Sequence, residues 1–181
     1  SEAFVLDLSD GSLILAEKKY EVNGEKCFYF SELFLECRAP LSQKSKLDIV
    51  TRAVDQVAKK YYGDEDAQKK MEIKDIICNE LEEQGEIKVS ELREKVFPGS
   101  PEMLEELDEK LDRYNLSYET VAPKNEQTIK KFQKQKLYTD TGIEISIPME
   151  EYRNPDHVEF ITNMDGTISV LIKNIGVLSS K

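Results

Sequence analysis

The sequence contains few of the residues on which most enzymes and membrane proteins depend. It has one histidine, His157, and eight glycines in 181 residues, and no glycine-rich phosphate-binding loop or serine or cysteine motif accompanies them. No apolar run approaches the roughly 20 residues that a membrane-spanning helix needs, and no signal-peptide pattern is present. We therefore expect a protein that is neither an enzyme nor a membrane protein, has no cofactor, and carries His157 as a surface residue.

Cysteine is also scarce. Cys27, Cys37 and Cys78 cannot all pair with one another, and their spacing matches no metal-binding motif. Each lies in an apolar or helical context, which favours reduced thiols in or near a core and a cytoplasmic protein. The acidic run at residues 64–66 resembles a cation site, but acidic residues at a helix start usually interact with the helix dipole. The sequence therefore predicts no metal site.

Alternating apolar and polar residues mark the N-terminal end. Residues 4–9 alternate before the turn pair Asp10-Gly11, and residues 17–22 and 25–28 flank the pair Asn23-Gly24. Asn-Gly favours a tight turn because both central positions take positive φ. Two antiparallel hairpins follow from this pattern, and the apolar stretch 28–37 predicts a short buried helix or strand.

The C-terminal end is again rich in strand signals. Residues 143–147 alternate cleanly after the turn Asp140-Thr141-Gly142, and residues 158–161 and 167–172 flank a second turn at 164–166. We expect these strands and the N-terminal hairpins to share one sheet. We also expect the chain, which begins without an initiator methionine, to follow a separate N-terminal half.

Helices are predicted between these two ends. A long helix over residues 43–62 carries an apolar stripe, and Gly63 ends it. A second helix over 64–84, a short extended link at 86–89, a third helix from Ser90 and a fourth from Pro101 to Tyr114 follow. This order of helix, strand, helix, turn and helix is that of a winged helix-turn-helix.

The charge of this middle region opposes a direct role in DNA binding. Residues 63–119 hold 18 acidic against eight basic residues, a net charge of −10 within a chain of −11. A helix that enters a DNA groove needs basic or amide side chains, yet the fourth helix exposes acidic ones. We expect a protein-docking surface instead, formed by Glu102, Glu105, Glu106, Glu109 and Asp112.

The sign of the charge reverses over residues 124–136, which have a net charge of +4. Ile129 and Phe132 predict a short helix there, with the lysines on its exposed face. That face is either an ordinary solvated surface or a sequence-independent contact to phosphates. The candidate DNA-binding residues are Lys124, Lys130, Lys131, Lys134 and Lys136.

Two stretches carry a resemblance to a known family: residues 20–26 leading into 29–37, and residues 139–149 followed by 165–174. They resemble the bacterial 37 kDa nucleoid-associated protein family, in its form from Gram-positive bacteria. The chain corresponds to the C-terminal portion of a full-length member. The resemblance implies a cytoplasmic protein of the nucleoid that binds double-stranded DNA and self-associates as a homodimer, but it assigns no DNA-contacting residue.

Two functional hypotheses remain open. In the first, the chain is the C-terminal region of a nucleoid-associated protein that binds double-stranded DNA non-specifically through lysines. In the second, its acidic helices dock a basic DNA-processing protein, so that DNA association is indirect. In both, the fold class is α+β, with β elements and a long helix in residues 1–62, an acidic helical subdomain in 63–119, and a basic helix and strands in 120–181.

Overall fold

The computed structural model describes residues 2–11, 13–22, 24–36, 40–63 and 66–179. Cys37, Asn23 and the acidic pair Asp64-Glu65, which the sequence singled out, lie outside these residues. By its contacts the chain divides into two compact units, Ser1–Ser42 and Gln43–Lys181. No helix in the described part of the chain is long and apolar enough to cross a membrane.

The first unit consists of two hairpins and one π-helical turn. Its elements are β1 (Ala3–Leu6), β2 (Leu13–Ala16), β3 (Lys19–Val22), β4 (Glu25–Phe28) and η1 (Tyr29–Phe34). β1 pairs with β2 and β3 with β4, both antiparallel, which confirms the two hairpins. The expectation of a buried element over residues 28–37 is wrong, because Ser31 alone is buried in η1 and the side chains of Tyr29 and Phe34 are exposed.

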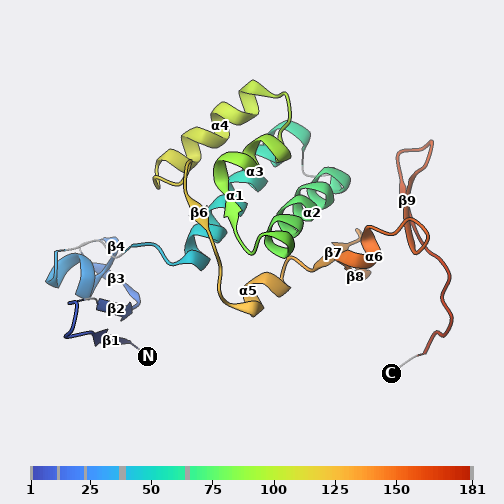
Figure 1. The fold of residues 1–181 in the computed structure, drawn as a ribbon. Helices are drawn as coiled ribbons and strands as arrows, with labels where there is room; N and C mark the ends of the chain where they lie inside the picture. The colour runs from blue at the N-terminus through green and yellow to red at the C-terminus, as the bar shows by residue number, and fades with distance from the viewer. Residues whose placement is uncertain (1, 12, 23, 37–39, 64–65, 180–181) are drawn as a thin grey trace. The chain divides into compact units, whose positions relative to one another are not determined.

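Four helices form the centre of the second unit (Figure 1). They are α1 (Gln43–Tyr62), α2 (Ala67–Glu83), α3 (Val89–Val96) and α4 (Pro101–Asp112). The apolar stripe of α1, including Leu47, Val54 and Val57, is buried in one cluster with residues from the other three helices, such as Leu107 of α4. Asp66 begins α2 by accepting a hydrogen bond from the backbone N–H of Lys69, as an N-cap residue does.

A short ladder joins the two ends of the segment that carries α3 and α4. β5 (Ile87–Lys88) pairs antiparallel with β6 (Thr120–Val121), and both Ile87 and Val121 are fully buried. The order helix, strand, helix, helix, strand is therefore that of the core of a winged helix-turn-helix. In the described residues β5 and β6 form a two-stranded sheet that no third strand joins.

Two hairpins and two short helices follow the helical core. They are α5 (Glu126–Lys130), β7 (Lys134–Tyr138), β8 (Glu144–Pro148), α6 (Met149–Tyr152), β9 (Val158–Thr162) and β10 (Ile168–Ile172). β7 pairs with β8 and β9 with β10, both antiparallel. In Figure 1 these elements extend from the helical core toward the C-terminus, and α6 lies beside β7 and β8.

The α+β class expected from the sequence is confirmed, but the expected single sheet is wrong. Every ladder in the described part of the chain is an isolated two-stranded sheet of two consecutive strands, and four of the five are hairpins. Each hairpin closes through its own turn, and its pairing does not extend to a strand from the other end. The division into 1–62, 63–119 and 120–181 stays a prediction.

Candidate nucleic-acid interface

The β7–β8 hairpin is defined by a tight turn and by alternation on both strands. Gly142 has a φ of +87°, a conformation that favours glycine. Thr139 stabilises the turn twice: its backbone oxygen accepts from the N–H of Gly142 at 3.0 Å, and its hydroxyl accepts from the N–H of Ile143 at 2.9 Å. The register that follows pairs Tyr138 with Glu144 and Lys136 with Ser146.

The two faces of this hairpin differ in chemistry. On the inner face Gln135 and Ile147 are buried. The Gln135 amide donates to the backbone oxygen of Met71 in α2 at 2.9 Å, which satisfies a polar group that would otherwise be costly to bury. On the outer face Lys134, Lys136 and Tyr138 are exposed, because alternate residues of a strand point to the same side.

A groove lies along this outer face and is bounded by α5. Its lining includes Gln127, Tyr138, Glu144, Ser146 and four lysines. We call it the lysine groove and define it by Lys130, Lys131, Lys134 and Lys136. It therefore brings together four of the five lysines that the sequence proposed for DNA contact, whereas Lys124 is exposed in the loop before α5 and is not part of the lining.

The expectation that one helix carries all five lysines is wrong. α5 ends at Lys130, and Lys134 and Lys136 belong to β7. Pairing with β8 and burial of Gln135 favour an extended chain after residue 133, and this overrides the helical spacing of Ile129 and Phe132. Four of the five lysines still line one groove, because α5 and β7 both border it.

Lys74 of α2 contacts the start of β7, beside the lysine groove. The ammonium of Lys74 donates to the backbone oxygen of Lys134 at 2.5 Å, which fixes the start of β7. Burial lowers the pKa of Lys74, and the nearby charge of Lys136 lowers it further. Among the four groove lysines, Lys130 forms an ion pair within the described chain. Its partner is the exposed Glu126, at 3.4 Å.

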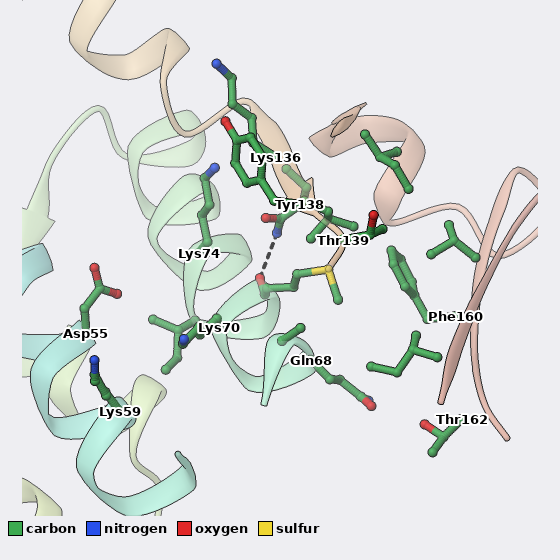
Figure 2. Close-up of a pocket in the computed structure, with 18 of the residues that line it drawn as sticks. Asp55, Lys59, Gln68, Lys70, Lys74, Lys136, Tyr138, Thr139, Phe160 and Thr162 are labelled. Carbon is green, nitrogen blue, oxygen red and sulfur yellow. Dashed lines mark hydrogen bonds between the residues drawn. The ribbon is translucent and has the colours of Figure 1, made fainter. Parts of the chain in front are cut away.

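A second groove, of about 1020 Å³, adjoins the first and shares Lys136 and Tyr138 with it. Figure 2 shows its lining between α2 and the β9–β10 hairpin, with Phe160 and Thr162 on the hairpin side and Lys74 on α2. Burial raises the pKa of the Asp55 carboxyl at its edge, while the charges of Lys70 and Lys74 lower it. Much of the remaining lining is apolar.

The acidic residues of α4 lie on a different surface, which is largely neutralised at its centre. Glu106 forms ion pairs with Lys60 of α1 at 2.5 Å and with Lys110 at 3.6 Å. Asp112 accepts a hydrogen bond from the Ser117 hydroxyl. Glu102, Glu105 and Glu109 are exposed beside them. α4 thus presents carboxylates outward and its apolar side to the core.

The remaining candidate residues have structural surroundings. His157 lies just before β9, partly exposed, and its Nδ1 contacts the carboxylate of Glu151. Cys78 is buried and Cys27 partly buried, and both are free thiols, as expected. No group of three or more histidine, cysteine or acidic side chains in the described residues is arranged to hold a metal ion.

The sequence reasoning missed the aromatic residue of the groove, Tyr138, and its neighbour Ser146. The signal was present, because residues 134–138 alternate and the turn at 140–142 separates them from the alternating residues 143–147. Taking 124–136 as one helix concealed this hairpin. Tyr138 is 67% exposed and lies two residues after Lys136 on the same face.

A model of a known protein family matches nearly the whole chain. The family model NA37, described as nucleoid-associated protein YejK, matches residues 6–177. No curated protein and no solved structure matches the chain. The match spans both units, the acidic helices and the lysine groove.

Proposed function

The chain belongs to the NA37 family of nucleoid-associated proteins, and on that premise we propose that its second unit contacts the phosphates of double-stranded DNA through the lysine groove. Nucleoid-associated proteins work in the bacterial cytoplasm, where the chromosome lies. The observation that carries the proposal is the convergence of Lys130, Lys131, Lys134 and Lys136, from the end of α5 and from β7, on one open groove.

This arrangement reconciles an acidic chain with DNA binding. The net charge of −11 repels a duplex at long range. At short range, contact depends on the charges that face the phosphates, and each lysine that neutralises a phosphate releases counterions. In the lysine groove Glu144 is the one acidic residue of the lining, and the surplus carboxylates of α4 belong to another surface.

The role proposed is non-catalytic and independent of base sequence. Lysine acts as a point charge without the planar, two-pronged geometry that reads base edges. Arginine, asparagine and histidine are absent from the lining of the lysine groove, and its two amide side chains, Gln127 and Gln133, stand beside four lysines. A groove in which lysines predominate mainly positions a backbone.

The test is binding of the chain to a duplex over a salt series, beside a variant in which Lys130, Lys131, Lys134 and Lys136 become glutamine. We expect the native affinity to fall with rising salt. If each lysine meets one phosphate, the slope of log affinity against log salt becomes shallower by about 0.9 per lost contact. Affinity at low salt falls by about tenfold or more.

A matched control changes four exposed lysines of other surfaces, Lys18, Lys19, Lys26 and Lys44, to glutamine. This control makes the same change in net charge as the groove variant. Because its four lysines do not line the groove, it should lower affinity only slightly and leave the slope unchanged. Equal effects of the two variants would show that total charge, and not the groove, governs binding. A native chain that fails to bind duplex even at low salt would refute the proposal.

The exposed Glu102, Glu105 and Glu109 favour a second candidate function, docking of a basic DNA-processing protein on α4. Spaced carboxylates on a helix resemble a phosphate backbone and suit a basic surface. Changing the three to glutamine should leave duplex binding intact or raise it slightly, since it removes negative charge. Strong loss of duplex binding in this variant would contradict the separation of the two surfaces.

A further inference from the structure

Tyr138 is the aromatic residue in the lining of the lysine groove, and it is exposed. It follows Lys134 and Lys136 on the outer face of β7, so these three side chains form a row with a spacing of about 7 Å. Tyr138 is 67% exposed, and among the described residues its ring stacks on no other aromatic ring. Figure 2 shows Lys136 and Tyr138 extending together from β7, near Lys74.

The neighbours of Tyr138 leave most of the residue exposed. Across the ladder Tyr138 faces Glu144, and Lys136 faces Ser146, so the neighbours on the outer face are small or flexible. Both grooves reach the ring, since Tyr138 lines each of them. The inner face of the hairpin is anchored to α2 through Gln135, which makes β7 a firm support for the row.

A row of lysines ending in an exposed aromatic ring suits a single strand better than a duplex. The bases of a duplex are stacked on one another and are not available to a side chain. An unpaired base presents a flat face that stacks on an aromatic ring whatever its sequence, while a basic groove follows the backbone. Lysines at alternate positions of a strand also match the separation of successive phosphates on an extended single strand.

We infer that the outer face of the β7–β8 hairpin binds unpaired nucleotides, with a base stacked on Tyr138 and the adjacent phosphates on Lys134 and Lys136. This inference rests on the proposed function, because it uses the same lysine groove. It adds a ligand class: single-stranded DNA, or the unpaired stretch of a gapped or distorted duplex. Glu144 opposes phosphate directly beside the ring, so the phosphates lie toward Lys136.

The experiment measures fluorescence anisotropy of the full chain with two labelled probes of equal length, a thymidine single strand of about 20 nucleotides and a mixed-sequence duplex. Three variants are compared: Tyr138→Ala, Tyr138→Leu, which keeps an apolar side chain but no flat ring, and Tyr138→Phe, which keeps the ring. Tyr118→Ala is the matched control, since Tyr118 is 87% exposed and lies outside both grooves.

We expect Tyr138→Ala and Tyr138→Leu to weaken single-strand binding by about 5- to 100-fold, the range that loss of one base–aromatic stack produces. Duplex binding should change by less than about twofold, because no base of the duplex reaches the ring. Tyr138→Phe and Tyr118→Ala should bind both probes as the native chain does. Circular dichroism of each variant confirms that its fold is retained.

Other outcomes separate this inference from the proposed function. In one outcome, Tyr138→Ala weakens the binding of both probes equally or of neither, while the glutamine variant of the four lysines still loses duplex binding. The stacking site is then refuted and the phosphate groove stands. If the native chain binds the single strand with the expected dependence on Tyr138 but no duplex at any salt, the duplex proposal fails alone. If neither probe binds at low salt, both fail.

Discussion

Burial governs the chemistry of Cys78. Its side chain is inaccessible to solvent in α2, and burial raises the pKa of the thiol to about 11, with the charge and hydrogen bond of Glu82 acting in the same direction. At pH 8 the thiolate is then about a hundredfold rarer than in a thiol of pKa 9.0. Cys27 is partly exposed and lies in the other unit.

We therefore predict that iodoacetamide at pH 8 alkylates Cys27 readily and Cys78 only after denaturation. The measurement is peptide mass spectrometry over time, in a chain whose Cys37 is replaced by serine so that two thiols remain. In denaturant the two rates should converge, which serves as the control. Equal rates in the native chain would contradict the burial of Cys78.

At the scale of elements, Arg153 joins the end of α6 to α2. Its guanidinium contacts Asp75 at 2.6 Å and Glu82 at 2.9 Å. The hydrogen bond from Arg153 is the main reason that the pKa of Glu82 lies below its ordinary value. A carboxylate with a lowered folded pKa stabilises the fold above its unfolded pKa, and this stabilisation is lost as pH falls through the folded pKa.

We predict that Arg153→Gln lowers the free energy of unfolding by about 1–2 kcal/mol at pH 7. The difference from the native chain should begin to shrink below the ordinary glutamate pKa of 4.5 and be lost as the pH falls through the lower pKa of folded Glu82. Urea unfolding at pH 7, 5 and 3.5 measures it. Arg52→Gln is the control, because Arg52 donates to Asp48 of its own helix. A difference that stays constant with pH would contradict the assignment.

The elements also show which features a sequence pattern can predict. α1 has the bounds expected, because a twenty-residue helix with a continuous apolar stripe leaves few alternatives. The helix predicted over residues 124–136 extends too far, because residues 134–136 belong to β7, whose start depends on contacts with β8 and with Met71 that a local pattern does not contain. The sequence also predicts a buried η1, but Tyr29 and Phe34 are exposed, and of its aromatic rings Phe30 alone is partly buried, stacked on Phe4 and Phe34.

For the candidate site the sequence predicted the charge and missed the geometry. The lysine-rich composition of residues 124–136 was readable, and four of those lysines do line one groove. Their gathering depends on the hairpin register, which also places Tyr138 beside them. The register of β7 and β8 follows from the turn at Gly142. A helix over residues 124–136, as the sequence predicts, is incompatible with that register.

At the scale of the whole molecule, the two units differ in how much core they hold. Every residue of the main buried cluster lies between Leu47 and Val121. In the first unit, Ser31 is the one buried residue among those whose burial is described. Stability of the chain should therefore come almost wholly from the second unit.

We predict that a chain beginning at Gln43 unfolds cooperatively, with a thermal midpoint within about 5 °C of the full chain. It should also retain duplex binding, since the lysine groove lies in the second unit. Differential scanning calorimetry measures the midpoint, and residues 1–42 alone should show no cooperative transition. Aggregation of the shortened chain, or a midpoint lower by more than about 10 °C, would show that the first unit supports the second.

The pairing of β5 with β6 has a consequence for synthesis on the ribosome. Ile87 leaves the ribosome well before its partner Val121, and at about 5–20 residues per second the wait is roughly 2–7 s. During that time α3 and α4 emerge without the ladder that closes their segment. Since the main buried cluster ends at Val121, the hairpin that carries the lysine groove emerges after every buried residue of that cluster has been synthesised.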